Sequence, residues 1–481
     1  MRRFALILIA AAPLAACAVG PSYAPPKTPA SAAAPFVSAD PSLIAGASTA
    51  GQPLPANWWR LYDDPVLDRL VQEALTKNED LKVAAANLAY AQALLGESRV
   101  GLLPATGLSA GADYGRSRPL APGPRPQAGW GYQAGFTAAY EVDLLGRVRR
   151  TIEASRRNAQ AVQAAEDAVR VAVAAGTAQA YADACGFGEE LASARQSQAV
   201  AQQTYDLVLV QRNAGAVSDF DLARAATTLE QARAAVPAID GQRRNALFEL
   251  AALLGRTPSQ VPAEAEACRS PPRIAVALPV GDGTALLKRR PDVRQADRQL
   301  AAATARIGVA TAGLYPQVTL GGSITDTAAT TQGLKSPAAV AFSVGPLISW
   351  SFPNIGLARA HIRESQAQAS GALASFDSVV LQALKEAEQA LTSYNAELAR
   401  HAALAAADRQ AGEAFRLAKV QYDAGSASFL DLLTAQAAYI QAEQALAASD
   451  LSLAVGQVAV FKALGGGWEN APPVAPPPPP R

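Results

Sequence analysis

The sequence predicts a mainly α-helical protein with a membrane β-barrel and an internal two-fold repeat. The segment from Tyr422 to Gln436 repeats the segment from Asn213 to Ala226 without a gap, and an offset of 210 residues places Gly215 on Gly425. Two segments in each half alternate apolar and polar residues, as β-strands do. Each half also contains a helical pattern of about 67 residues, and the glycine turn after it is typical of a helical hairpin.

The chain begins with a pattern typical of a bacterial signal peptide. Two arginines precede an apolar run from Phe4 to Leu14, which is too short to span a bilayer as a helix. Small residues directly before Cys17 resemble a lipobox, so we expect residues 1–16 to be removed and Cys17 to be lipidated. The alternative is an ordinary secretory signal with an incidental cysteine. Residues 17–56 are rich in Pro, Ala and Ser and predict an extended, lipidated tether.

Regular structure is expected from residue 57 onward. Amphipathic helices are predicted from about Pro65 to Thr76 and from about Asp80 to Gly101. From about 105 to 142 apolar residues favour even positions, while small and polar residues favour odd positions. This segment therefore predicts two strands with one apolar and one polar face, separated by a Pro-rich loop from Ser117 to Ala128.

The second half repeats this strand pattern from about 316 to 352, which gives four strands per chain. An apolar face with aromatic residues and a polar opposite face are typical of a transmembrane barrel with a wet lumen. A half-exposed soluble sheet is the alternative. Four strands cannot close a membrane barrel, and open strand edges do not survive in lipid. The chain is therefore expected to pool its strands with at least one further copy of itself.

Helical hairpins are predicted at about 146–254 and at about 356–464. The outgoing helix of each contains no proline and would be about 100 Å long, which suits the crossing of a periplasm and far exceeds a bilayer. Pro237 is expected to kink the first return helix. Residues 256–283 form a Pro-rich linker between the halves, and residues 468–481 predict a disordered Pro-rich tail.

The composition excludes several classes of function. The formal net charge is +1, so the chain has no basic footprint for nucleic acid. It contains only two histidines, His361 and His401, and both are expected on the surface of one helix. No catalytic site, metal site or cofactor is predicted, and an enzyme is not expected.

Four segments together carry a family resemblance. They are NWWRLYDDPVLDRLVQEALTKNEDL (57–81), YEVDLLGRVRR (140–150), LLKRRPDVRQADRQLAAATARIGVATAGLYPQVTL (286–320) and WSFPNIGLARA (350–360). They resemble the TolC-like outer membrane factors, and most closely the lipoprotein branch of NodT type. The resemblance covers about residues 17–467.

The resemblance implies a homotrimer in the outer membrane. Its barrel would have twelve strands, four from each chain, and a long coiled-coil tunnel of α-helices would continue the barrel into the periplasm. Residues 57–255 and 284–467 would be the two repeats of the fold, and the linker at 256–283 would help to build a small mixed belt around the tunnel.

The implied function is the outer-membrane exit channel of a tripartite efflux pump. In that role the chain would passively conduct small toxic compounds or drugs to the medium. Its partners would be a periplasmic adaptor protein and an inner-membrane resistance-nodulation-division transporter. The outlet of a type I secretion system shares the fold and is the first alternative. A structural envelope tether is the second, although a tether would not need strands with a polar face.

The two hairpin turns are expected to dock on the adaptor. Gly215 and Gly425 permit backbone turns that other residues resist. The residues beside them are small, so that a helical hairpin of the partner could approach closely: Ala216, Val217, Ser218, Ser426, Ala427 and Ser428. The alternative is that these are merely favourable turn residues.

The resemblance also implies a gate at the same tips. Tyr422 matches a tyrosine that in this family bonds an aspartate of the first hairpin, and Asp221 matches that aspartate. Asp431 matches the first residue of an acidic ring around the axis. Alternatively, Asp221 and Asp431 simply favour the helix N-termini near which they lie.

The chain departs from the family pattern at two gate positions. Thr434 stands where a second acidic residue is often found, and Ala427 stands where a gating arginine can lie. The gate is therefore expected to be less acidic, with Leu430 and Phe429 narrowing the bore.

A disulfide bond is expected between Cys185 and Cys268. With Cys17 acylated, these two thiols remain in an oxidising compartment. Cys185 lies about 58 Å along its helix from Gly146, near the level of the implied belt, and Cys268 lies in the linker that would build the belt. The alternative is two free, partly buried thiols.

Overall fold

The computed structural model of the chain describes residues 18–27, 29–39, 48–50, 54–116, 128–274, 277–353 and 355–478. The predicted signal peptide at 1–16 and the predicted lipidation site Cys17 lie outside these residues. The chain forms two compact units: the first contains residues 88–162 and 295–377 with the start of the described chain, and the second contains most of the remainder. Each unit draws on both halves of the sequence, so the units do not coincide with the two repeats.

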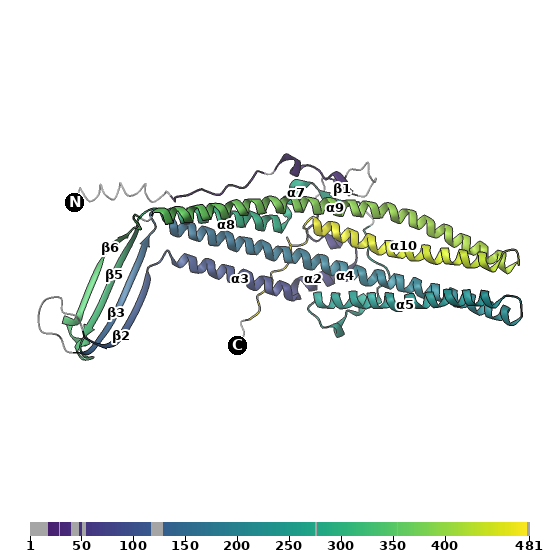
Figure 1. Cartoon of the computed structure of the whole chain (residues 1–481), viewed down its shortest axis with the longest axis horizontal. Helices are drawn as coiled ribbons and strands as arrows, with labels where there is room; N and C mark the ends of the chain where they lie inside the picture. The colour runs from purple at the N-terminus through teal and green to yellow at the C-terminus, as the bar shows by residue number, and fades with distance from the viewer. Residues whose placement is uncertain are drawn as a thin grey trace. The chain divides into compact units, whose positions relative to one another are not determined.

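The first unit contains an antiparallel sheet of four strands in the order β2-β3-β5-β6 (Figure 1). The strands are β2 (Ala105–Gly115), β3 (Gly129–Val142), β5 (Gln317–Ala328) and β6 (Val340–Ser349). These bounds match the strand segments expected from the alternation of apolar and polar residues. Within the described chain β2 and β6 are each paired on one side only, so the sheet has two open edges.

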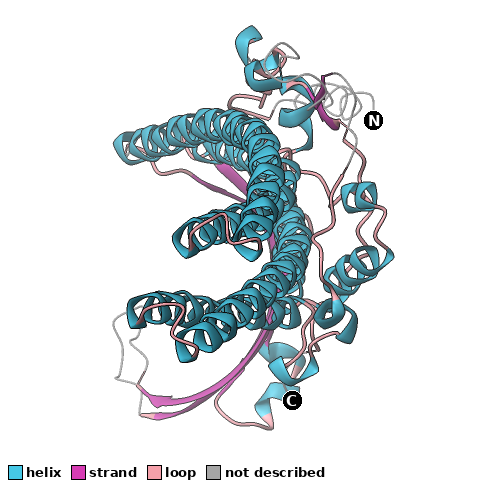
Figure 2. Cartoon of the chain, turned by 90° about the vertical axis from the view of Figure 1, so that its right-hand side faces the viewer, coloured by secondary structure: helices cyan, strands magenta, loops and turns pink. Residues whose placement is uncertain are grey.

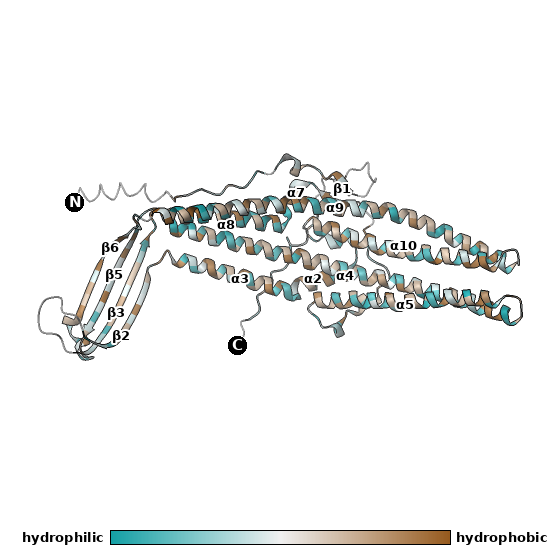
Figure 3. Cartoon of the chain, viewed as in Figure 1, coloured by the Kyte–Doolittle hydropathy of each residue, from teal (hydrophilic) through white to brown (hydrophobic). Residues whose placement is uncertain are grey.

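The strand register separates the two faces of the sheet. One row of paired residues is apolar across all four strands: Leu108, Phe136, Ile324 and Phe342. The row one residue away is small or polar throughout: Gly107, Thr137, Ser323 and Ser343. Successive side chains of a strand point to opposite faces, so the sheet has one apolar and one polar face, and the alternation along the strands is visible in Figure 3.

Two helical hairpins follow the two strand pairs. The first consists of α4 (Arg147–Asn213) and α5 (Asp219–Leu253), and the second of α9 (Ile355–Asp423) and α10 (Phe429–Ala463). Figure 2 is viewed from the side of the turns and shows the short loops that join the two helices of each hairpin. Helix α5 continues through Pro237, so the proline does not end it.

Helix α10 is unusually apolar. By length and composition it is the one described helix that could cross a membrane, but 56 % of its most apolar stretch is buried inside the protein. At its C-terminal end the ring of Phe461 stacks on that of Trp58, with ring centroids 4.8 Å apart, and both residues are fully buried. This apolar composition therefore marks α10 as a core helix.

Short elements of the second unit form a mixed α/β belt. They are β1 (Ser48–Ala50) and β4 (Leu278–Gly281), which pair in parallel, with α2 (Pro65–Lys77), α6 (Ala263–Ala267) and α7 (Gly283–Arg289). Short 3-10 turns accompany them at Ala30–Ala33, Val37–Ala39, Trp58–Tyr62 and Pro258–Gln260. Two more, Gly333–Lys335 and Pro337–Ala339, lie between β5 and β6. The remaining helices are α3 (Glu79–Val100) and α8 (Pro291–Ala312).

Two matching joints hold the ends of the return helices. Asn78, directly before α3, donates from Nδ2 to the carbonyl of Leu253 at 3.0 Å. Arg290, directly before α8, donates from Nη1 to the carbonyl of Ala463 at 2.9 Å. Leu253 and Ala463 are equivalent positions of the repeat, and carbonyls in a last helical turn lack partners within their own helix. Each joint supplies the missing donor and ties a return helix to the helix that precedes the strand pair of the same half.

The N-terminal segment is extended but packed against helices. In the first unit the N–H of Val19 donates to the carbonyl of Leu145 at 3.0 Å, and Gly20 approaches Gly308 so closely that a Cβ on Gly20 would collide with it. In the second unit Asn395 donates from Nδ2 to the carbonyl of Ser38 at 2.7 Å. The segment predicted as an extended tether is thus docked on helices at residues 19–20 and at Ser38.

The start of the C-terminal tail is also held in place. The indole Nε1 of Trp468 donates to the carbonyl of Arg289 at 3.2 Å, and the guanidinium of Arg294 lies 4.6 Å from the centre of the Trp468 ring. The prediction of disorder from residue 468 is therefore wrong at its first residue, because the indole finds both a carbonyl and a cation. Residues 471–478 contain no helix or strand.

Candidate functional site at the hairpin tips

The two turns share one backbone geometry. Gly215 has φ +77° and Gly425 has φ +73°, in the left-handed region that glycine favours. Behind each glycine a backbone N–H returns to the preceding helix: Ala216 donates to the carbonyl of Gln211 and Ser426 to that of Gln421, both at 2.8 Å. These are the bonds with which a left-handed residue closes a helix end. The tips are therefore built turns, and glycine is required at both.

The residues predicted to dock on a partner lie at the surface of these turns. Ala216, Ser218, Ser426 and Ser428 are exposed. The two remaining small residues, Val217 and Ala427, are half-buried. The tips are thus open to approach by another protein.

Both return helices begin with a capping box. The hydroxyl of Ser218 accepts from the N–H of Asp221, whose carboxylate accepts from the N–H of Ser218, and Ser428 and Asp431 repeat the arrangement. Hydrogen bonds from the serine hydroxyl and backbone hold the pKa of each aspartate below its ordinary value. The caps satisfy donors that a helix start leaves unpaired.

The structure does not form the expected bond between Tyr422 and Asp221 within the chain. The carboxylate of Asp221 is engaged in its own capping box, because it occupies the third position of α5. The phenol of Tyr422 donates instead to the side-chain carbonyl of Gln211 at 2.6 Å. A tyrosine link between the two hairpins therefore exists, but its acceptor is a neutral amide on α4.

Phe429 is also placed differently from the expectation. Its side chain is 8 % exposed and packs in a cluster with Val208, Ala225, Leu432 and Leu433. A ring buried between helices of both hairpins cannot narrow a bore. Of the other gate residues, Leu430 is 47 % exposed and Asp431 is exposed, so these two remain open to the surroundings of the tip.

The predicted cysteine pair lies far from the tips, in the second unit. Cys185 of α4 and Cys268 of the linker are joined by a disulfide bond, with the Cα atoms 4.9 Å apart. The linker then continues past α10, where Gln457 bonds both the N–H and the carbonyl of Ile274 at 3.1 Å. The linker between the two halves is therefore fastened to the outgoing helix of the first hairpin and the return helix of the second.

An ion-pair cluster secures the same stretch of linker. Arg273 lies 2.7 Å from the carboxylate of Asp450, which also lies 2.5 Å from Nε2 of His401. His401 was expected at the helix surface, and its half-buried contact with Asp450 corrects that expectation. No group of three or more metal-ligating side chains occurs among the described residues.

Three residues with structural contacts lie outside those predicted from the sequence: Gln211 and the joint residues Asn78 and Arg290. The signal for the joints was present, because each residue directly precedes the second helix of its half and the two stretches NEDL and RPDV resemble each other. For Gln211 the sequence carries no comparable signal.

Comparison with known proteins identifies the family. The family model described as outer membrane efflux protein matches residues 70–256 and 284–466, which are the two halves of the repeat. The chain is 31 % identical to the outer membrane protein OprJ of Pseudomonas aeruginosa, over 96 % of this chain and 95 % of OprJ. It is 30 % identical to nodulation protein T of Rhizobium leguminosarum bv. viciae, over 96 % and 93 %.

A solved structure agrees with this result. The outer-membrane channel OprN superposes with a TM-score of 0.87 at 35 % identity, and the match covers 94 % of this chain and all of that chain. The family is one of channels, not a class of enzymes. The chain therefore belongs to the outer membrane efflux protein family and is an outer-membrane efflux channel.

Proposed function

We propose that three copies of the chain form the exit duct of a tripartite pump. The duct receives cargo from a periplasmic adaptor and an inner-membrane resistance-nodulation-division transporter and releases it to the medium. The observation that carries the proposal is the four-stranded sheet, which has an apolar face, a polar face and two open edges.

The open edges support a head-to-tail assembly. In lipid every backbone N–H and carbonyl needs a partner, so edge strands β2 and β6 must be paired by another chain. Pairing of β2 with β6 of the next copy is a heterologous contact, which closes into a ring. Three copies give twelve strands, above the minimum of about eight for a membrane barrel.

Exposed apolar side chains extend this contact along the helices of the first unit. On α3, Tyr90 is 67 % and Val100 is 59 % exposed; on α9, Leu373 is 42 % exposed. These helices precede β2 and follow β6, so they flank the same open edges. A neighbouring copy that pairs with the edges also covers these side chains, which supports the trimer.

The docked N-terminal segment supports lipidation of Cys17. The bond from Val19 to Leu145 holds residue 19 at the end of β3, just before α4 begins. In this proposal the lipid anchor, two residues before Val19, would enter the membrane at the periplasmic rim of the barrel. Cys17→Ser abolishes acyl labelling in this proposal and leaves the barrel in the outer membrane.

The tips carry adaptor docking and the resting gate. The exposed turns and their small side chains fit a partner's helical hairpin. The bond between Tyr422 and Gln211 and the apolar cluster around Phe429 hold the two hairpins together at rest. Asp431 and Leu430, both exposed at the start of α10, are the residues proposed to face the bore.

Native mass spectrometry of detergent-extracted protein tests the assembly, and the expected species is a trimer. A strictly monomeric species contradicts the proposal.

Efflux assays test docking: tryptophan at Ala216 or Ser426 is expected to abolish efflux without lowering the amount of trimer, whereas tryptophan at the exposed Asn213 is the control for bulk near the turn. If deletion of this chain abolishes a co-expressed protein secretion activity and leaves drug export unchanged, the type I secretion outlet is favoured instead.

A further inference from the structure

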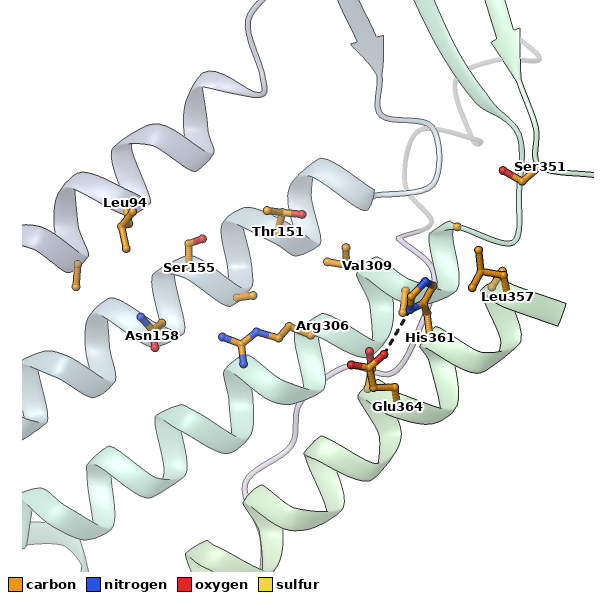
Figure 4. Close-up of a pocket in the computed structure, with 16 residues that line it drawn as sticks. Leu94, Thr151, Ser155, Asn158, Arg306, Val309, Ser351, Leu357, His361 and Glu364 are labelled. Atoms are coloured by element: carbon orange, nitrogen blue, oxygen red, sulfur yellow. Dashed lines mark hydrogen bonds and ion pairs between the residues drawn. The ribbon is translucent and has the colours of Figure 1, made fainter. Parts of the chain in front are cut away.

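The first unit contains a cavity of about 700 Å³ that the channel function leaves unexplained. Four helices line it: α3, α4, α8 and α9 (Figure 4). Its polar lining includes Ser155, Asn158, Arg306, His361 and Glu364. The volume lies within the range of small-molecule sites, about 300–1,000 Å³.

The cavity opens on the face that becomes the lumen in the proposed duct. On α8 the cavity is lined by Arg306 and Ala310, whereas Asp297 and Gly308 face the N-terminal segment. At 100° per residue these two pairs lie on opposite sides of the helix. The N-terminal segment leads to Cys17 and the lipid outside the barrel, so the opposite side faces inward.

Charges in the cavity are unevenly paired. The guanidinium of Arg306 makes no hydrogen bond or ion pair with the described residues, and the side chain points into the cavity (Figure 4). The one carboxylate in the lining, Glu364, already has a partner, because Oε2 lies 3.4 Å from Nδ1 of His361. A ligand would therefore meet one cation without a protein partner on α8 and one exposed carboxylate, Glu364, on α9.

The rest of the lining is apolar or small. Leu94, Val309 and Leu357 provide apolar contact surface. Alanines and a glycine leave the space open: Ala91, Ala154, Ala310, Gly313 and Ala358. This surface suits a ring system or an aliphatic body, and the arginine fixes one end of it.

We propose that this cavity is a transit site for amphipathic anions, in which Arg306 binds a carboxylate or sulfonate while the apolar body lies against Leu94, Val309 and Leu357. The proposal rests on the proposed duct, since the inward assignment of the cavity depends on it. The site gives the channel a weak preference among cargo molecules, and the three copies form a ring below the barrel.

Equilibrium binding to the trimer in nanodiscs tests the proposal. The probes are dansylate, which carries a sulfonate, and dansylamide, which has the same ring system without the charge. We expect dansylate to bind about tenfold more tightly, the effect of one charge-assisted hydrogen bond. Arg306→Gln is expected to remove that difference, and Arg306→Lys to retain part of it.

Arg363→Gln is the matched control. Arg363 is an exposed arginine of α9 that does not line the cavity, and its loss changes the net charge by the same amount. Equal binding of the two probes by the unmodified trimer overturns the proposal, and so does an equal loss in both glutamine variants. Binding at equilibrium needs no transport, so its failure does not count against the exit duct, and failed efflux does not count against the site.

Discussion

The two hairpins hold different chemistry at matching positions of their tips. In the first, Arg212 Nε lies 2.7 Å from the carboxylate of Asp219 across the turn, and both side chains are largely exposed. In the second, the equivalent residues are Tyr422 and Phe429, whose ring centroids lie 6.0 Å apart, and Phe429 is buried. The glycine turn and the capping box are the same in both. Backbone requirements have thus been retained in both copies, while contacts across the turn have diverged into a solvated tip and a packed tip.

The same contrast recurs where extended segments cross the long helices. Cys185 of α4 is bonded covalently to the linker, and the equivalent residue of α9, Asn395, holds the N-terminal segment by one hydrogen bond to Ser38. Equivalent positions of α4 and α9 therefore each hold an extended segment against the helix. The strength of the fastening differs, and that difference can be measured.

Removal of the disulfide bond is expected to give the largest effect on stability. Cys185→Ser should lower the free energy of unfolding by about 4 kcal/mol, since the bond closes a loop with a sequence separation of 83 residues. Asn395→Ala should cost about 1 kcal/mol. Chemical denaturation of the trimer without reductant measures both. If reductant leaves the midpoint of the unmodified protein unchanged, the disulfide bond contributes nothing to stability.

The joints at the return helices give the next contrast. Arg290 lies 2.6 Å from Asp292 and 2.7 Å from Glu386, while Asn78 caps α3 through the N–H of Leu81 at 3.1 Å. Arg290→Ala leaves two carboxylates without their cation. The expected cost is about 3 kcal/mol, at the low end for a broken ion pair of this kind, because both carboxylates are partly exposed to solvent.

Asn78→Ala removes neutral hydrogen bonds and should cost about 1–2 kcal/mol. Thermal unfolding of both variants in the same detergent ranks them. An equal shift in melting temperature would show that the charge network of the second joint adds nothing to the neutral joint of the first.

At one pair of equivalent helix positions, a pH dependence is expected in the first half alone. Burial raises the pKa of Asp183 in α4 to about 6 from an ordinary value of 3.8, and the equivalent residue of α9 is Ser393. Below about pH 3.8 the carboxyl is protonated in both the folded and the unfolded state, so Asp183 has no effect on the free energy of unfolding. As the pH rises to about 6, burial of the carboxyl in the folded state lowers the free energy of unfolding, and this cost persists at higher pH.

Asp183→Asn should therefore stabilise the protein at pH 7 and be neutral at pH 3, and Ser393→Ala should show no such change with pH. Melting temperatures measured across pH 3–8 give the comparison. A stability difference between Asp183→Asn and the unmodified protein that is constant with pH would contradict the assignment.

The smallest effect concerns the tips, where the two hairpins differ most visibly. Tyr422→Phe removes the donor to Gln211 and should weaken the resting closure by about 1 kcal/mol, which raises single-channel conductance in planar bilayers. Arg212→Ala removes an exposed ion pair and should leave conductance unchanged. A rise in both variants, or in neither while the trimer stays intact, would mean that the packed tip is not the gate.

The sequence predicted the features that depend on local pattern. Strand bounds followed because apolar residues such as Leu108 and Phe136 alternate along each strand with residues that are mostly small or polar. Helix bounds followed because Ser218 and Ser428 open both return helices with the same cap. These signals lie within a few residues, and the duplication shows each of them twice.

Contacts between helices could not be predicted in the same way. Helix α10 is apolar on most of its surface, so no periodicity distinguished the buried Phe429 from the exposed Leu430. The acceptor of Tyr422 depends on the axial register of α9 against α4, which side-chain spacing within one helix does not determine. The aspartate expected from the resemblance was already occupied by its own cap.

The divergence of the tips has a consequence for stoichiometry. The proposed ring of three chains would present six hairpin ends in alternation, three bearing the pair Arg212 and Asp219 and three bearing Tyr422 and Phe429. Six identical partner subunits arranged on such a ring occupy two kinds of position, and no symmetry operation of the ring exchanges them. Titration of the partner should therefore saturate in two steps of three subunits each, with the salt-sensitive step at the charged ends.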